Sequence, residues 1–194
     1  MTKPAALEVI LDEHNALSVL LQSMSLLVKQ GPGNTPGAFF DGLRAMLFYI
    51  DEFPERLHHP KETDFLFPKV AALAPEIRDA IAKLDRDHSK GTTAVLELQH
   101  LLLGWQLMGE VRRQKFVDAL TRYLAFYREH MELDERVIIP TALKVLTDAD
   151  WDDLAAAFQE NRDALTGKYP AQEEYKQLFS HIARIAPAPI GTGS

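Results

Sequence analysis

Apolar residues recur at intervals of three and four along most of the chain, whereas the period-two alternation of β-strands is hard to find. The first apolar stripe ends at GPGNTPG, residues 31–37, and the third ends at GWQLMGE, residues 104–110. Glycine and proline in such stretches favour breaks between helices. The pattern therefore predicts four long helices, which span residues 4–29, 36–73, 75–103 and 110–145.

Four long helices joined by short loops are typical of an up-down-up-down bundle. Weaker helical signals follow the fourth helix. Asp148 or Asp150 can cap a short fifth helix, and a further helical turn or two is expected within residues 170–183. We therefore expect an all-α fold in which residues 1–147 form an antiparallel four-helix bundle. Residues 148–194 are expected to form short additional C-terminal helices and a tail, packed on the bundle or following it.

Composition and charge narrow the classes of function. The chain has 46% hydrophobic and 25% charged residues, as an ordinary globular protein does, and a net charge of −7 without any Lys/Arg cluster. We therefore expect no nucleic-acid partner. The longest apolar runs are shorter than the roughly 18 residues that a membrane span needs, so we expect no membrane partner and a cytoplasmic location. Nothing in the sequence identifies a protein partner.

The chain contains no cysteine, so any metal must be held by nitrogen and oxygen atoms. One polar pattern that suits this chemistry occurs twice: a histidine, an acidic residue four positions later, and a proline ten positions later. The two copies are His58, Glu62 and Pro68, and His130, Asp134 and Pro140. A lone histidine precedes each copy, His14 the first and His88 the second. The pattern therefore predicts two helical hairpins that carry similar sets of polar residues.

The helical phase indicates that these side chains converge. His14, His88 and His130 fall on the apolar stripes of their helices, and His58 does so less cleanly because nearby prolines disturb the phase. Residues four apart on a helix point to the same side, so a histidine and a carboxylate at that spacing can reach one ion. A single histidine on an apolar stripe is usually a hydrogen-bonded core residue. Four of them on four helices predict a shared metal, because isolated buried imidazoles and carboxylates are costly to desolvate.

Nitrogen and oxygen ligands without sulfur suit iron or manganese, with zinc as a further alternative. Six or more ligands are too many for one tetrahedral structural site. They suit two metal ions that are bridged by carboxylates and a small oxygen species.

The sequence resembles the hemerythrin-like, or HHE cation-binding, domain family over about residues 8–145. The resemblance rests on four motifs: LDEHNAL around His14, HHPKETDFLFP from His58, DRDHSKG around His88, and HMELDERVIIP from His130. It implies an antiparallel four-helix bundle with two iron ions, bridged by an oxo or hydroxo group. It also implies binding of dioxygen or a related small oxidant, such as nitric oxide or peroxide, for carriage, sensing or detoxification.

Carried over residue by residue, the resemblance implies four terminal ligands and two bridging carboxylates. The terminal ligands are His14, His58, His88 and His130, and the bridging carboxylates are Glu62 and Asp134. Typical hemerythrins place the second carboxylate five residues after the last histidine, which would select Glu135. They also carry a further histidine where this chain has Thr92. His59 either replaces that ligand or faces outward as a partner of the ligands.

Two other functions remain open from the sequence. A ferritin-like di-iron oxidase would use the Glu-x-x-His spacing of Glu55 with His58 and of Glu97 with His100, but it leaves the other histidines of the pattern without a role. A metal-dependent signalling or interaction module would couple metal binding to folding. Three tyrosines lie near the ligand positions, namely Tyr49, Tyr123 and Tyr127. They could donate hydrogen bonds to ligands or to bound oxygen, but we interpret them as amphipathic core residues.

Overall fold

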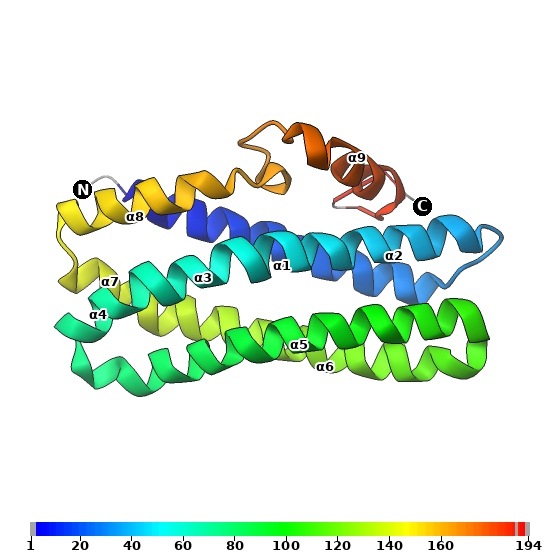
Figure 1. Cartoon of the computed structure of the whole chain (residues 1–194), viewed down its shortest axis with the longest axis horizontal. Coiled ribbons are helices and arrows are strands. Elements are labelled where there is room, and N and C mark those ends of the chain that lie inside the picture. Colours follow the sequence, from blue (N-terminus) through cyan, green and yellow to red (C-terminus); the bar gives the residue numbers. More distant parts are fainter. Residues whose placement is uncertain (1–2, 189, 193–194) are drawn as a thin grey trace.

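The protein is described by a computed structural model that covers residues 3–188 and 190–192. The outer ends of the two regions predicted from the sequence lie outside the described residues, namely residues 1–2 of the first and 193–194 of the second, as does residue 189. Every regular element within the described residues is a helix, which confirms the all-α class. The long axis of the molecule is formed by four helical segments that lie side by side and run alternately in opposite directions (Figure 1). This arrangement is consistent with the predicted up-down-up-down bundle.

The four segments match the predicted helices closely. The first is α1 (Ala5–Gln30). The second comprises α2 (Pro36–Ile50), η1 (Asp51–His58), α3 (His59–Lys61), η2 (Glu62–Leu66) and α4 (Phe67–Leu73). The third comprises η3 (Pro75–Ile77) and α5 (Arg78–Met108). The fourth comprises η4 (Glu110–Arg112), α6 (Arg113–Leu133), η5 (Asp134–Ile138) and α7 (Ile139–Val145).

The third segment runs further than the sequence predicts, because the helix continues through Gly104 to Met108. It ends at Gly109, which has a φ of 77° and donates its backbone N–H to the carbonyl oxygen of Trp105 at 2.8 Å. Glycine adopts this left-handed conformation without the steric cost that a Cβ adds. The sequence placed the end of the third helix at residue 103, before Gly104, but Gly104 lies inside the helix, and Gly109 marks its end.

Wide π-helical turns interrupt the second and fourth segments. η1, η2 and η5 each end two residues before a proline, namely Pro60, Pro68 and Pro140. Proline has no N–H and its ring clashes with the carbonyl four residues earlier, so a regular α-turn cannot form there. A π-turn spans five residues instead and is common at functional sites. Glu62 begins η2 and Asp134 begins η5, so both predicted bridging carboxylates lie on such turns.

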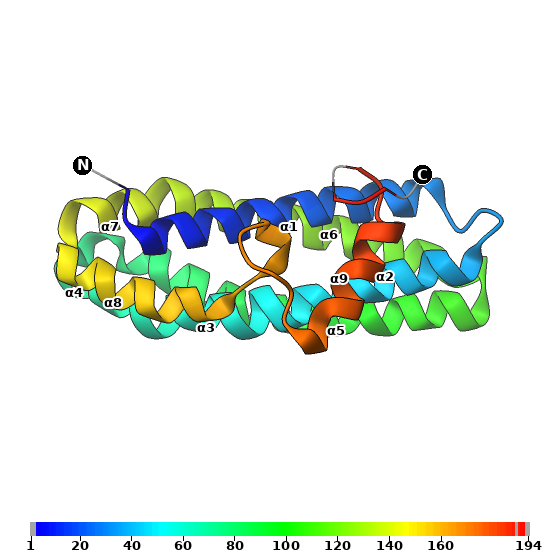
Figure 2. The same cartoon turned by 90° about the horizontal axis from the view of Figure 1, so that it is seen from above.

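The C-terminal region lies on the α1 and α2 side of the molecule, away from α5 and α6 (Figures 1 and 2). Its elements are α8 (Asp148–Phe158), η6 (Gln159–Asn161), η7 (Ala164–Thr166), η8 (Glu173–Tyr175) and α9 (Lys176–Ile185). α8 packs on α1, and α9 packs on α2. Helical structure in both predicted places is therefore confirmed, whereas the division into two regions at residue 147 stays a prediction.

The buried apolar residues form two clusters, one toward each end of the helical segments. One cluster contains Trp105 and Phe116, and the other contains Phe67, Trp151 and Phe158. In every segment the predicted ligand histidine falls between residues of the two clusters; His14, for example, lies between Ile10 and Leu17. A polar layer thus divides the apolar core. Within the part of the chain that the structure describes, no helix is both long and apolar enough to cross a membrane.

Candidate metal centre

Three predicted ligands from two helical segments meet in a first triad, formed by His14, His58 and Glu62. Nε2 of His58 lies 3.2 Å from Nε2 of His14 and 3.2 Å from Oε1 of Glu62, and the third side of the triangle measures 4.0 Å. Ligands about 2.1 Å from one ion and at right angles lie about 3.0 Å apart. The first triad therefore has the dimensions of half of a coordination shell.

A second triad lies beside the first and consists of His59, His88 and His130, with one nitrogen of each within 4.8 Å of the others. The rings of His59 and His88 stack with their centroids 4.2 Å apart and their planes at 11°. Nε2 of His88 also lies 3.2 Å from Oε2 of Glu62. Glu62 therefore presents one oxygen to each triad, which is the geometry of a bridging carboxylate.

Several fully buried polar atoms in this layer have no hydrogen-bond partner among the described residues. They are both oxygens of Glu62, both oxygens of Asp134, both ring nitrogens of His130 and Nε2 of His88. Leaving so many donors and acceptors unpaired costs about 1–3 kcal/mol for each group. A cation removes that cost, because these nitrogen and carboxylate atoms are ligand atoms. The donor set thus fits a metal centre.

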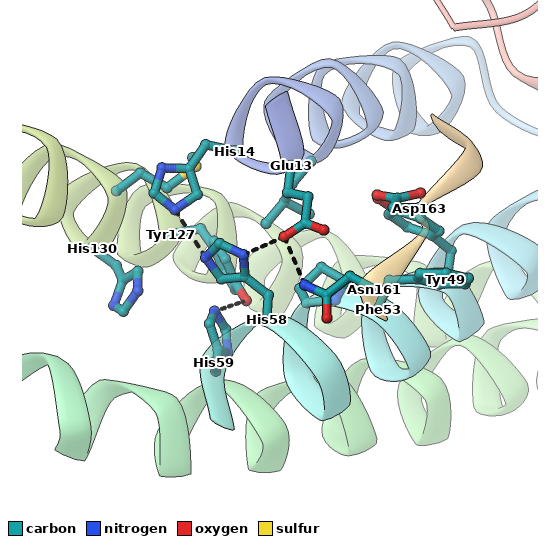
Figure 3. A pocket seen from close by; sticks show the side chains of 13 residues that line it. Glu13, His14, Tyr49, Phe53, His58, His59, Tyr127, His130, Asn161 and Asp163 are labelled. Carbon is teal, nitrogen blue, oxygen red and sulfur yellow. Dashed lines mark hydrogen bonds and ion pairs between the residues drawn. The ribbon is translucent and has the colours of Figure 1, made fainter. Parts of the chain in front are cut away.

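The outer ring nitrogens of three histidines are held by side chains around the triads. Nδ1 of His58 donates to Glu13 at 2.7 Å, Nδ1 of His14 donates to Glu135 at 3.1 Å, and Nδ1 of His88 donates to Thr63 at 2.9 Å. A proton on Nδ1 leaves the lone pair of Nε2 free to bind a metal. Figure 3 shows the His14 and His58 rings turned toward each other on one side and His58 bound to Glu13 on the other.

The comparison with protein families agrees with this geometry. The family model described as the hemerythrin HHE cation binding domain matches residues 5–142, which is well over half of the chain. The chain belongs to the hemerythrin HHE family. The comparisons with curated proteins and with solved structures found no match. The match includes both triads and ends before α8, so the C-terminal region lies outside the family's domain.

The pKa shifts differ between the two triads of this hemerythrin-family centre: His58 and Glu62 of the first favour their charged forms, whereas His59 and His130 of the second favour their neutral forms. Burial alone would lower the pKa of His58, but the carboxylates of Glu62 and Glu13 outweigh it and raise that pKa well above its usual range. Burial would likewise raise the pKa of Glu62, yet the imidazoles of His58 and His88 hold it well below its usual range. Each group thus stabilises the charged form of the other. Protons therefore compete with a metal for the first triad.

Three further groups of the layer favour their neutral forms, namely His59, His130 and Asp134. Burial lowers the pKa of His130 to about 3 and moves that of His59 well below its usual range, with His88 adding to the shift of His59. Burial and the charge of Glu62 raise the pKa of Asp134 well above its usual range. Neutral imidazole is the form that binds a metal.

Asp134 and Glu135, the two candidates for the second carboxylate, lie in different surroundings. Asp134 is fully buried, whereas the side chain of Glu135 is 44% exposed and contacts the outer nitrogen of His14. The hydrogen bond from His14 lowers the pKa of Glu135, which stays ionised. The structure thus brings Asp134 into the buried layer with Glu62 and leaves Glu135 on its outer side.

His59 lies inside the layer and is held by residues around the second triad. Its Nδ1 lies 3.3 Å from Glu55, and its Nε2 lies 3.1 Å from the hydroxyl of Tyr127. The same hydroxyl donates to Glu55 at 3.0 Å, and one hydroxyl proton cannot serve both partners. Tyr127 is therefore buried in the core, as interpreted from the sequence, and also contacts a candidate ligand, which was the alternative.

Thr92 stands where typical hemerythrins have a further histidine, and here it donates to Glu55 at 3.0 Å. Gly91 provides the space for that carboxylate, since a Cβ at this position would lie 2.7 Å from Oε1 of Glu55. Burial raises the pKa of Glu55 to about 7. This side of the centre is therefore built to hold His59 through Glu55 rather than to supply another ligand from α5.

Sequence reasoning did not identify Glu13 and Asn161. Glu13 is buried beside His14 because α1 is covered on two sides, by the other segments and by α8. Asn161 lies at the end of η6 and donates to Glu13 at 3.0 Å. An acidic residue directly before a predicted ligand was a usable signal for Glu13, whereas no periodic pattern marks Asn161.

The residues of the ferritin-like alternative separate in space. Glu55 is buried at the second triad, but Glu97 and His100 are both exposed on α5. The second Glu-x-x-His pair therefore makes no contribution to the buried layer.

A small cavity opens beside the first triad. His14, His58 and His130 line one end with Tyr127 beside them, and Tyr49 and Asp163 line the other end (Figure 3). It has room for about one water-sized molecule. The hydroxyl of Tyr49 donates to Asp163 at 2.5 Å, which closes the far end.

Proposed function

We propose that this hemerythrin-family protein holds two iron ions within an antiparallel four-helix bundle and binds dioxygen or a related small oxidant there. The observation that carries the proposal is the shared carboxylate of Glu62, whose two oxygens face two separate triads. Iron in such a centre supplies reversible binding or reduction of a small oxidant. Manganese and zinc are the alternative metals for this donor set.

The residues divide into ligands and partners of ligands. We assign the terminal ligands as His14 and His58 on one side, and as His59, His88 and His130 on the other. We assign Glu62 and Asp134 as the carboxylates between the ions, because both are fully buried with unpaired oxygens. Glu135 is assigned to the outer nitrogen of His14, where an ionised carboxylate makes the imidazole a stronger ligand.

The size of the cavity supports the proposal that the bound molecule has only a few atoms, as dioxygen, nitric oxide and peroxide do. Its space suits about one water-sized molecule, and its walls include the apolar side chains of Leu17, Phe53 and Met131. Such walls exclude water from the bound molecule. Carriage, sensing and detoxification all begin with this binding step, and the cytoplasmic location stays a prediction.

The proposal is tested by iron binding to a double variant, His58→Ala with His130→Ala, which removes one ligand from each triad. We expect it to retain much less iron than the parent after anaerobic loading with Fe²⁺. The matched control is His100→Ala with His181→Ala, which removes one exposed and one half-buried histidine outside the polar layer and is expected to bind iron as the parent does. Equal iron in parent and ligand variant would rule the proposal out.

A metal-dependent interaction module is the second candidate. It is favoured by the polar layer, which takes ligands from all four helical segments and divides the apolar core. Without a metal the unpaired groups of that layer destabilise the fold. A large increase in proteolysis of the metal-free form would favour this function over simple carriage.

A further inference from the structure

The C-terminal region touches the metal centre, although it lies outside the matched family domain. Phe158 and Asn161 come from the end of α8 and from η6. The ring of Phe158 lies 5.8 Å from the ring of His58, with the planes at 74°. Asn161 is 1% exposed. This region therefore covers His58 with one apolar and one polar side chain.

Asn161 links the two helical segments that carry the first triad. Its Nδ2 donates to Oε2 of Glu13 on α1 at 3.0 Å, and its Oδ1 accepts a hydrogen bond from Lys61 on α3. Oε2 of Glu13 also accepts from Nδ1 of His58 at 2.7 Å. Figure 3 shows the two bonds to Glu13, in which Asn161 and His58 meet on one carboxylate oxygen.

The chemistry of these partners fixes the direction of each hydrogen bond. The ammonium group of Lys61 only donates, and an ionised Glu13 only accepts, so the amide of Asn161 must present oxygen to one and nitrogen to the other. Glu13 then accepts the Nδ1 proton of His58, which leaves Nε2 of His58 as the metal-facing atom. A carboxylate on the outer nitrogen also makes the imidazole a stronger ligand.

We propose that Asn161 is a positioning residue of the metal centre, which holds Glu13 against Nδ1 of His58 and so strengthens metal binding at the first triad. The inference rests on the proposed two-metal function and extends it to the C-terminal region. Asn161 makes no contact with the ligand atoms, so its effect passes through Glu13. The second triad has its own partners, Thr63 and Glu55, and is independent of Asn161.

The decisive variant is Asn161→Asp, which keeps the shape of the side chain and the acceptor for Lys61 but removes the donor to Glu13. In anaerobic titrations of the full chain with Fe²⁺, we expect the affinity of one site to fall about tenfold, and the other to stay unchanged. The matched control is Asp150→Asn, the reverse exchange in the same C-terminal region, at a residue that bonds Lys69 and Thr147 rather than Glu13. We expect this control to bind as the parent does.

A double-mutant cycle separates positioning from general damage to the fold. In a Glu13→Ala background, Asn161→Asp should change the affinity by less than about twofold, because the residue through which it acts is gone. Asn161→Ala repeats the cycle if Asn161→Asp does not fold. The proposal is overturned by parental affinities at both sites, or by an equal loss in the two backgrounds. A parent that binds no Fe²⁺ overturns the proposed function together with this inference.

Discussion

Oε2 of Glu62 lies 3.2 Å from Nε2 of His88, which belongs to a different helical segment. The other oxygen of the same carboxylate faces His58, four residues earlier on its own segment. Glu62 is fully buried and neither oxygen has a hydrogen-bond partner within the described residues. One side chain therefore joins the two triads, and its loss should affect both.

Glu62→Gln tests this joint role. We expect the variant to lose most of the metal from both sites, since an amide carries no charge and its nitrogen cannot bind a cation. Total iron after anaerobic loading, measured per chain, is the readout. Glu97→Gln is the control, because Glu97 is exposed on α5 and should leave the iron content unchanged. Loss of iron in the control would instead favour a ferritin-like site.

Asp134→Asn should have opposite effects on the metal-free and metal-bound protein. Burial raises the pKa of Asp134, so at neutral pH folding of the metal-free protein must bury its charge or take up a proton. The neutral amide avoids this cost and should stabilise the metal-free protein by about 1–3 kcal/mol in urea unfolding. The same change should weaken metal binding. Glu135→Gln, at the exposed neighbour, should retain the metal with a smaller loss of affinity. If Glu135→Gln loses more metal than Asp134→Asn, Glu135 is the ligand.

His59→Phe distinguishes a ligand from a packing residue. Phenylalanine keeps the stack on His88, whose ring centroid lies 4.2 Å away, but it has no nitrogen for a metal. We expect the variant to fold and to lose metal from the second triad while the first triad still binds. Two metal ions retained at parental affinity would assign His59 to packing alone.

Asp163 makes the stability of the metal-free protein depend on pH in a predictable direction. Burial raises the pKa of Asp163 from 3.8 to about 6 in the folded state. The folded state therefore holds the proton more tightly than the unfolded state, so the stability contributed by Asp163 falls as the pH rises from about 4 to about 6. The loss is on the order of 3 kcal/mol, since one pKa unit is about 1.4 kcal/mol.

The comparison that isolates this group is parent against Asp163→Asn in urea unfolding of the metal-free protein. The free-energy difference between them should move in favour of the variant between pH 4 and pH 7, because the amide does not titrate. A difference that is constant with pH would show that Asp163 keeps an ordinary pKa.

Much of the fold could be predicted because each long helix buries one apolar face. The i, i+4 spacing also placed Glu62 beside His58, and the structure puts the two groups 3.2 Å apart. The ten-residue spacing from histidine to proline occurs twice, and its cause was not visible in the pattern. Pro68 follows a π-turn that starts at Glu62, and Pro140 follows one that starts at Asp134. Those turns depend on backbone hydrogen bonds, which the periodicity of side chains does not report.

The partners of the ligands were harder to predict, because they come from contacts between distant parts of the chain. Glu13 reaches His58 only because α1 and the second segment pack together, and Asn161 reaches Glu13 from 148 residues away. The place of His59 depends on Gly91, which makes room for Glu55. None of these contacts follows from the spacing of residues along one helix.

The metal content of the parent protein tests the central claim most directly. The protein would be purified from iron-supplemented cells, and its metals and visible absorption spectrum measured before and after addition of oxygen or peroxide. The account predicts about two irons per chain and a visible band that changes on addition of the oxidant. A colourless protein with one metal ion or none per chain would contradict it.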